Sequence, residues 1–567
     1  MTRQNTPYKV VDLFAGPGGL AEGFSSILDD TGQRAFDIVM SVEKEASAHR
    51  TLRLRAFTRQ FNHGELPEAY YDLLRGRIDL AELAEMYADE WQAAEREAIL
   101  ATLGSEEGDQ LVYDRLDELL ETGAGDTGRQ FIVIGGPPCQ AYSLIGRARN
   151  AGRKDYDPET DDRHFLYREY ISILSKLQPA AFVMENVKGM LSSSVGKQRI
   201  FEKIMVDLER PGRIGHEYLL LALAPAESDL LNAEPNLQPR DFIVRAEEFG
   251  IPQARHRVFI VGVRKDLIEE TTERLTQTFL RHQGERRTTQ DVIANLPALR
   301  SGLSRGDAPE AWSEAVRAGA RKSIAALQSS DCRLHQNITE AARNLCEDAA
   351  KLEVRQRKST LSELPPSNDE LERFLRDPRL SFTINHESRG HMADDLTRYL
   401  FCAIFARVTD GQSPRARDFP AELAPAHSNW TSGKFADRFK VQVEGRPSTT
   451  VTSHISKDGH YYIHPDPEQC RSLTVREAAR LQTFPDNYLV IGCGALGASV
   501  AVLLAQAGLG HFTLYDGQYL DRTNTSRHPL GADYVDQNKA KALAKHLTKR
   551  FPHLRGVDDH DAHVISA

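Results

Sequence analysis

The stretch YKVVDLFAGPGGLAEGF, residues 8–24, decides the fold class of this chain. It begins with an apolar, β-branched run, YKVVDLF, turns at AGPGG, and continues into LAEGFSSIL, where the apolar residues have helical spacing. A buried strand that leads through a glycine turn into a helix is typical of α/β sheets. Further strand-like runs follow at 36–43 (FDIVMSVE), 130–136 (QFIVIGG), 180–186 (AAFVMEN) and 256–263 (HRVFIVGV). Their alternation with helical segments predicts an open, mostly parallel sheet.

Composition narrows the class of protein. With 567 residues, of which 40% are hydrophobic and 27% charged, the chain is expected to form several globular domains. No apolar run is long enough to span a bilayer, and the first residues, MTRQNTPYKVVDLF, lack the pattern of a signal peptide. Six cysteines without paired spacing predict neither a disulfide framework nor a zinc site. These features predict a cytoplasmic protein with no membrane partner and no metal.

The charge balance leaves a nucleic-acid partner open. A net charge of −10 argues weakly against such a partner, because phosphate contacts need Lys and Arg. Basic residues nevertheless cluster locally, in LIGRARNAGRK (144–154) and RHQGERR (281–287). Net charge therefore does not decide the question.

Three later stretches differ in pattern from the strands. Residues 66–122 are rich in Ala, Glu and Leu, which predicts inserted helices. Residues 265–465 are polar and irregular, with short β-like pieces such as RPSTTVTSHI and HYYIH, and predict a second domain. At 489 a new strand, glycine turn and helix begin in YLVIGCGALGASVAVLLAQAG, and HFTLYD follows as a further strand.

Cys139 is the first candidate catalytic residue. It lies in GGPPCQAYS (135–143), just past a predicted strand, where α/β sheets place their ligand sites. A lone cysteine is usually an inert, buried filler. A cysteine in a Gly-Gly-Pro-Pro turn followed by polar residues is poor core material, so we interpret Cys139 as a nucleophile.

Glu185, Arg255 and Arg257 are the next candidates. The apolar strand of FVMENVKG (182–189) delivers Glu185, which is either a helix cap or a working carboxylate. In PQARHRVFIVG (252–262), Arg255 and Arg257 point to the same side if the segment is a strand. Two arginines on one side of a strand suit an anionic or carbonyl-bearing ligand.

Taken together, these pieces resemble the DNA cytosine-5 methyltransferase family. The resemblance rests on VVDLFAGPGGLAEGF, GGPPCQAYS, MENVKG, GIPQARHRVFIVG and RSLTVREAARLQTFPD, in the family's order, across roughly residues 8–488. It implies a methyltransferase that uses S-adenosylmethionine on cytosines of double-stranded DNA. In that reaction Cys139 attacks carbon 6 of a flipped cytosine, Glu185 acts at N3, Arg257 holds O2, and Arg255 supports the pocket.

The same resemblance implies the residues that bind S-adenosylmethionine. The loop after the first strand is the cofactor loop, and Glu43 at the end of the next strand is the acid that grips the ribose. The family's third acidic position is open here between Glu65 and Asp126. The residues implied in cofactor binding are Phe14, Ala15, Gly16, Gly18, Gly19, Glu43, Pro138 and Leu166.

The C-terminal segment resembles another family. GCGALG (492–497) is a GxGxxG between a strand and an apolar helix, and LYD ends the next strand. The segment is similar to the opening of the ThiF and ubiquitin-activating (E1-like) adenylyltransferases, and it replaces the Gly-Asn-x-Val-Pro-Pro segment that closes the methyltransferase family. This second resemblance implies an ATP site at Gly492, Gly494, Gly497, Asp516, Asn524, Arg527 and Lys539.

Both resemblances together predict the domain organisation. The fold class is α/β: a Rossmann-like sheet of the S-adenosylmethionine-dependent methyltransferases, an irregular target-recognition domain and a partial C-terminal Rossmann-like ThiF unit. We expect a catalytic domain at 1–264 with a helical insertion at about 64–128, a target-recognition region at 265–465, a return to the catalytic domain at 466–488, and the ThiF-like unit at 489–567.

Three functions are compatible with this organisation. The leading hypothesis is a nucleoid-associated DNA cytosine-5 methyltransferase of a restriction–modification or phage-defence system, with a cognate restriction endonuclease as partner. The second is an ATP-dependent adenylyltransferase that carries a DNA-targeting arm. The third is a DNA-binding fusion without catalysis.

Overall fold

The computed structural model divides the chain into two compact units. Unit 1 comprises Met1–Tyr70, Glu82–Phe249 and Arg255–Gln283, and unit 2 comprises Tyr71–Ala81, Gly250–Ala254 and Gly284–Ala567. The predicted domain boundaries stay predictions. The residues that the structure describes are 6–121, 127–138, 166–195, 198–213, 215–224, 237–268, 280, 285–328, 332–347, 352, 355–359, 369–425, 430, 439–452, 455, 459–489, 511–515, 537, 541–543, 545 and 556–560.

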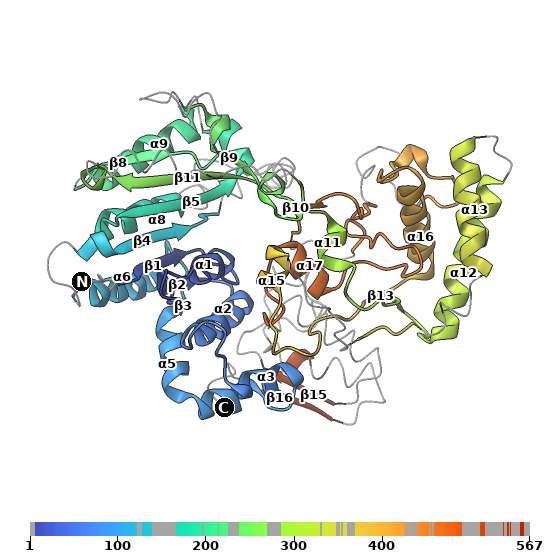
Figure 1. Ribbon diagram of the computed structural model, residues 1–567, viewed down its shortest axis with the longest axis horizontal. Coiled ribbons are helices and arrows are strands. Elements are labelled where there is room, and N and C mark those ends of the chain that lie inside the picture. The colour runs from blue at the N-terminus through green and yellow to red at the C-terminus, as the bar shows by residue number, and fades with distance from the viewer. Residues whose placement is uncertain are drawn as a thin grey trace. The chain divides into compact units, whose positions relative to one another are not determined.

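Unit 1 contains the central sheet, with the strand order β3-β2-β1-β4-β5-β11-β8 and β9 paired to β11 (Figure 1). Neighbours from β3 to β5 are parallel, whereas β11 is antiparallel to β5, β8 and β9. The predicted mostly parallel sheet is thus confirmed. The strands are β1 (Tyr8–Leu13), β2 (Phe36–Glu43), β3 (Ala98–Leu100), β4 (Phe131–Gly135), β5 (Ala181–Val187), β8 (Tyr218–Leu221), β9 (Ile243–Arg245) and β11 (His256–Arg264).

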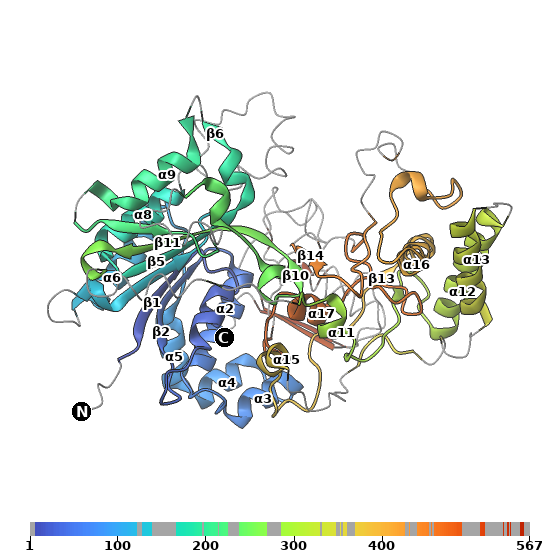
Figure 2. The ribbon, with the colours of Figure 1, turned by 45° about the horizontal axis from the view of Figure 1, so that its top comes forward.

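Helices cover both faces of this sheet because its buried strands carry apolar side chains on both sides. Along β1, Val11 and Leu13 belong to the larger core cluster, whereas Val10 lies in a smaller cluster on the opposite face. Figure 2 shows helices on the two faces. The larger cluster packs under α6 (Glu106–Glu121), α8 (Leu166–Leu177) and α9 (Ile200–Glu209), and the other face contacts α1 (Gly19–Ser25), α2 (Ala46–Arg59) and α5 (Ala88–Glu97).

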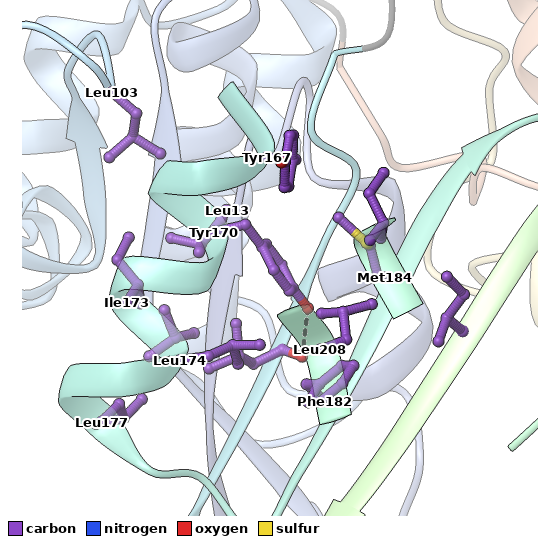
Figure 3. Packing of buried hydrophobic residues seen from close by; sticks show 14 of the residues in the cluster. Leu13, Leu103, Tyr167, Tyr170, Ile173, Leu174, Leu177, Phe182, Met184 and Leu208 are labelled. Carbon is purple, nitrogen blue, oxygen red and sulfur yellow. Dashed lines mark hydrogen bonds between the residues drawn. The ribbon is translucent and has the colours of Figure 1, made fainter. Parts of the chain in front are cut away.

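Close packing fixes the centre of the sheet. Tyr170 of α8 points into the larger cluster, and its hydroxyl donates to the carbonyl oxygens of Val133 (3.3 Å) and Val183 (3.2 Å), which bridges β4 and β5 (Figure 3). Gly262 of β11 is paired with Phe182 of β5. A Cβ atom on Gly262 would stand 2.1 Å from the Phe182 ring, so the position requires glycine.

The core of unit 2 is largely helical. Its apolar cluster joins α12 (Pro309–Leu327), α13 (Arg333–Glu347) and α16 (Ala393–Val408). The sequence predicted short β-like pieces in this region, and β structure forms in both of the pieces named. RPSTTVTSHI contains β14 (Ser448–Thr449), and HYYIH contains Ile463, which makes isolated bridges, whereas the helices of this core were not predicted.

The remaining elements of units 1 and 2 are short. They are α3 (Glu68–Arg75), α4 (Leu80–Met86), α11 (Thr289–Ile293), α15 (Glu370–Leu375), α17 (Val475–Leu481), β6 (Ser194–Val195), β7 (Gln198–Arg199), β10 (Gln253–Ala254), β12 (Gly302–Leu303), β13 (Gly390–His391) and the 3₁₀ helices Thr127–Gln130, Lys188–Ser192, Pro211–Arg213, Pro239–Phe242, Ala246–Phe249, Lys265–Leu267 and Ala416–Asp418. In the described part of the chain, no helix has the length and apolar character that crossing a membrane requires.

A set of fully buried ion pairs stabilises unit 2 around α17. Arg471 donates to both carboxylate oxygens of Glu477, at 2.7 and 2.6 Å, and Glu477 also accepts from the amide of Thr474 in a capping box. Arg480 makes the same two-pronged contact with Asp486, at 2.8 and 2.6 Å. Burial alone would raise the pKa of Glu477, but the charge and hydrogen bonds of Arg471 outweigh it and hold that pKa far below its ordinary value.

Glu477→Gln is expected to lower the free energy of unfolding of unit 2 by roughly 3–5 kcal/mol, because Arg471 would stay buried without its counter-charge. The lowered pKa of Glu477 means that this stabilisation is present at neutral pH and is lost only as the pH falls toward the folded-state value. Denaturant titration at pH 7 measures the change. Glu314→Gln, which breaks an exposed pair with Arg321 on α12, is the control and should change little. Equal small losses in both variants would contradict the assignment.

Two strands are described in the C-terminal segment. β15 (His511–Tyr515) pairs in parallel with β16 (Gly556–His560), so the strand predicted in HFTLYD is confirmed. Parallel neighbours require a crossover connection, as in βαβ units. The seven residues of the predicted ATP site (Gly492, Gly494, Gly497, Asp516, Asn524, Arg527 and Lys539) lie outside the described residues.

Candidate active site

The sheet topology brings the predicted site segments of unit 1 to one edge. Strands β1, β2, β4 and β5 are parallel, so the segments that follow them start from the same edge. β11 runs the opposite way, and its first residues therefore lie beside the end of β5, with Arg257 paired to Val187. This arrangement is why residues far apart in the sequence can share one site.

Glu185 and the two predicted arginines contact each other at this edge. The Glu185 Oε1 atom lies 3.1 Å from Nη2 of Arg255 and 3.0 Å from Nε of Arg257. The side chains are 20%, 37% and 17% exposed, respectively, so the cluster is shielded but reachable. Burial lowers the pKa of Arg257, the charge of Arg255 lowers it further, and Glu185 partly offsets both effects. The prediction that both arginines lie on one side is confirmed, whereas their roles stay predictions.

The turn after β4 is fitted closely to its neighbours. Gly135 has a φ of +157°, and a Cβ atom there would stand 2.3 Å from the Leu13 carbonyl oxygen. A Cβ atom on Gly136 would stand 2.8 Å from Oε2 of Glu185, the carboxylate oxygen on the side of this turn. A side chain at position 135 would therefore clash with the backbone of β1, whereas one at position 136 would displace the Glu185 carboxylate.

Asn186 joins this turn to β5. The side chain is buried, its Nδ2 donates to the Pro137 carbonyl oxygen at 3.2 Å, and its Oδ1 accepts from the Val187 amide at 2.8 Å. Pro137 precedes Cys139 by two residues, and Cys139 itself lies outside the described residues. Sequence reasoning missed Asn186, although a polar residue next to Glu185 in an apolar strand was an available signal.

The predicted cofactor loop packs against the end of β2. The amide of Gly16 donates to Oε2 of Glu43 at 2.8 Å, and the Glu45 amide donates to Oε1 at 2.7 Å. Phe14, Gly16 and Gly18 have φ angles of +59°, +59° and +94°, so the loop turns sharply where β1 ends. The position of a Cβ atom on Gly16 is open, with no described atom within 4 Å.

The other predicted cofactor residues lie in the described part of unit 1. Leu166 begins α8, and a Cβ atom on Gly104, in the loop after β3, would lie 3.4 Å from its Cδ2. The strand that ends beside Glu43 is β3, whose following residue, Ala101, donates to the Glu43 carbonyl oxygen at 3.1 Å. Pro138 is the last residue described before Cys139.

The third acidic position is not assigned. β3 was not predicted from the sequence, and the five residues after it, ATLGS, contain no acid. Glu65 instead precedes α3, and its carboxylate accepts from Asn62 at 2.8 Å. Asp126 lies outside the described residues.

The side chains at the loop fit S-adenosylmethionine. Glu43 has carboxylate oxygens that could accept from a ribose diol, two backbone amides hold its orientation, and the partly buried Phe14 at the start of the loop is an aromatic residue that could contact an adenine. Among the residues with described positions, no group of His, Cys, Asp or Glu could hold a metal ion.

Two family models match the chain. Residues 127–507 match the C-5 cytosine-specific DNA methylase model, and residues 469–565 match the ThiF family model. The two matches overlap around the join that the sequence predicted at 489. The position of that boundary therefore stays a prediction.

Curated relatives match over most of the chain. Type II methyltransferase M.Bpa9945I of Bacillus paralicheniformis is 32% identical over 499 residues, which cover 84% of this chain and 91% of the relative. Type II methyltransferase M.AgeI of Thalassovita gelatinovora is 24% identical over 88% of this chain and 97% of the relative. A crystal structure described as a DNA modification methyltransferase of an E. coli prophage matches 85% of this chain and 90% of its own, with 18% identity and a TM-score of 0.43.

The family match covers more than half of the chain, and the first relative exceeds 30% identity over more than two thirds of it. The ThiF match concerns only the C-terminal end. The family match implies the use of S-adenosylmethionine and DNA as the substrate. The chain belongs to the C-5 cytosine-specific DNA methylase family and is a DNA methyltransferase.

Proposed function

We propose that this chain methylates carbon 5 of a cytosine that is flipped out of double-stranded DNA, with Cys139 as the covalent nucleophile. The observation that carries the proposal is the Glu185 cluster, in which two guanidinium groups contact one carboxylate oxygen at the end of β5. Asn186 joins this cluster to the turn that leads to Cys139. An acid, two arginines and a thiol are the groups that nucleophilic attack on a cytosine ring needs.

Each side chain has a role in this reaction. Carbon 5 of cytosine is a poor nucleophile, so the Cys139 thiolate first forms a bond to carbon 6. Electron density then moves into the ring, where Glu185 donates a hydrogen bond or proton to N3 and Arg257 holds O2, with Arg255 supporting both. S-adenosylmethionine supplies the methyl group to carbon 5. Loss of the proton from carbon 5 restores the ring and breaks the bond to Cys139.

The cofactor site is proposed at the ends of β1, β2 and β4. Glu43 accepts hydrogen bonds from the ribose hydroxyls, and Phe14 contacts the adenine. The glycines of the loop allow its backbone to approach the cofactor closely. The full set is Phe14, Ala15, Gly16, Gly18, Gly19, Glu43, Pro138 and Leu166.

Gly136→Ala is expected to lower turnover by on the order of 10- to 100-fold, because the new Cβ atom would displace the Glu185 carboxylate. The displacement follows from the 2.8 Å separation that the substitution would create. Steady-state methyl transfer measures the effect. Gly23→Ala in α1, where a Cβ atom meets no described atom within 4 Å, is the matched control and should keep full turnover. Equal turnover in the two variants would contradict the placement of Glu185 against this turn.

The proposal is tested by bisulfite sequencing of DNA from bacterial cells that express the chain. The expected result is complete protection of cytosines within one recurrent sequence, which reports activity and target together. No protected cytosine, with soluble protein present, would contradict it.

The relatives named as type II methyltransferases support a restriction–modification role with a cognate endonuclease. We propose that the chain acts in the nucleoid of a bacterial cell, where its DNA substrate lies.

A second candidate function rests on the ThiF match. The parallel pair β15 and β16 suits the nucleotide-binding sheet of an adenylyltransferase with a bound ATP. ATP–pyrophosphate exchange is the test. Exchange that is lost in Asp516→Ala would support adenylation, and no exchange with any carboxylate substrate would leave methyl transfer as the activity of the chain.

A further inference from the structure

Asp12 of β1 is a buried carboxyl group to which no role has been given above. Its side chain is 0% exposed, and neither oxygen makes a hydrogen bond to any described residue. Its paired neighbours are Ser41 of β2 and Ile134 of β4. Ser41 is also fully buried, and its hydroxyl has no hydrogen-bond partner within the described residues. Buried polar groups are normally satisfied, so two adjacent exceptions indicate a function.

The location of Asp12 connects it with the cofactor loop. It precedes Phe14 by two residues, and Ser41 precedes Glu43 by two residues. At a strand rise of about 3.3 Å per residue, the pair lies roughly one two-residue step below the proposed cofactor contacts. The apolar side chains of Val10, Ile38, Ile134 and Ala21 form the cluster on this face of the sheet. None of these four side chains carries a group that could donate a hydrogen bond to a carboxylate.

The charged groups around Asp12 come from several packed elements. Arg59 of α2 faces it but is paired with Glu97 of α5, while Glu43 and Glu97 contribute negative charge. The Ala21 amide of α1 lies near Asp12, although outside hydrogen-bond geometry. Tyr170 of α8 interacts electrostatically with Asp12, but its hydroxyl donates to the Val133 carbonyl oxygen. Burial raises the pKa of Asp12 to about 8, more than Arg59 and the amide lower it.

We propose that Asp12 is a positioning residue for S-adenosylmethionine: it is protonated in the free protein and releases its proton when the positively charged cofactor binds at the adjoining loop. The ionised carboxylate then stabilises the positively charged cofactor from beneath the loop. The demethylated product, S-adenosylhomocysteine, has no sulfonium charge and gains nothing from this carboxylate. Asp12 therefore favours exchange of product for cofactor. This inference rests on the cofactor site proposed above.

The direction of the pH effect follows from linkage. A bound cation favours the ionised form, so the pKa of Asp12 falls from about 8 on binding and a proton passes to the buffer. Affinity for S-adenosylmethionine is expected to rise by up to about tenfold per pH unit toward pH 8 and to level off above it. Affinity for S-adenosylhomocysteine should stay nearly constant over this range.

Titration calorimetry of the full chain at pH 7, in phosphate and in Tris, tests the inference. These buffers differ in ionisation enthalpy, so the difference in binding enthalpy counts the released protons. We expect close to one proton for S-adenosylmethionine and close to none for S-adenosylhomocysteine. This comparison needs no variant, so it remains valid even if a substitution at Asp12 prevents folding.

Variants then assign the proton to a residue. Asp12→Asn should bind S-adenosylmethionine more weakly and without proton release, whereas Ser41→Ala should keep the release. Binding of S-adenosylmethionine without proton release, or undiminished release in Asp12→Asn, would overturn the inference and leave the proposed function intact. No binding of S-adenosylmethionine by the folded chain would instead overturn the cofactor site itself, and the inference with it.

Discussion

Cys139→Ser is expected to lower methyl transfer by on the order of 10³-fold or more, while affinities for DNA and S-adenosylmethionine change little. A serine hydroxyl is far less ionised than a thiol at neutral pH, so the bond to carbon 6 no longer forms at a useful rate. The substitution changes one atom and leaves the turn residues before it in place. Single-turnover assays, together with separate binding measurements, distinguish loss of chemistry from loss of binding.

DNA that contains 5-fluorocytosine tests the covalent step itself. Fluorine cannot leave carbon 5 as a proton does, so the bond between the enzyme and carbon 6 persists and the complex survives denaturation. The unchanged chain should form this complex, and Cys139→Ser should not. Cys332→Ser removes an exposed cysteine of unit 2 and is the matched control, with undiminished trapping expected. Undiminished trapping in Cys139→Ser would refute the nucleophile.

Glu185→Gln is expected to lower turnover by roughly 10²-fold or more, with the affinity for S-adenosylmethionine unchanged. Glutamine keeps the shape of the side chain but cannot give a carboxylic proton to N3. The variant also loses the charge that pairs with Arg255 and Arg257. Turnover measured from pH 6 to pH 9 should be low throughout, because the amide of glutamine does not gain or lose a proton in this range.

Glu247→Gln is a control for this experiment. Glu247 contacts His256, 2.7 Å away, which lies in the same strand as Arg257, and it is not a member of the ion pairs between Glu185 and its two arginines. A structural effect on β11 would lower turnover in both variants alike. Full turnover in Glu185→Gln would move that residue into a purely structural role.

The strands around the site could be predicted because their residues carry a local signal. β1, β2, β4, β5 and β11 are apolar, β-branched runs, and the alternation of a strand was enough to place Arg255 and Arg257 on one side. β3 escaped prediction because it has only three residues, Ala98–Leu100, within a stretch whose composition is helical. The helical composition of the surrounding stretch predicted a helix here, whereas the strand forms because its backbone pairs with β2.

Other parts of the site depend on contacts that no local pattern reports. Gly136 matters because Glu185, far along the chain, stands where its side chain would be. Asn186 matters because it reaches the Pro137 carbonyl oxygen, and Asp12 because its neighbours in two other strands give it no hydrogen bond among the described residues. Such relations require the strand register, which one sequence does not contain.

The helices of unit 2 escaped prediction for a different reason. α13 carries Ile338, Ala342 and Leu345 at helical spacing, but polar residues separate them and the surrounding segment is rich in charge. A polar, irregular stretch was therefore expected where an amphipathic helix packs on α12 and α16. The helical spacing of apolar residues is present in the sequence, but the surrounding charged residues hide the length of the helix and the helices on which it packs.

Transfer of a labelled methyl group tests the central claim most directly. The purified chain is incubated with double-stranded DNA and S-adenosylmethionine labelled in its methyl carbon, and the DNA is digested to nucleosides for mass spectrometry. The account predicts label in 5-methyldeoxycytidine alone, and none when Cys139→Ser replaces the unchanged chain. Label in another methylated nucleoside, or no label from a chain that binds both DNA and S-adenosylmethionine, would contradict it.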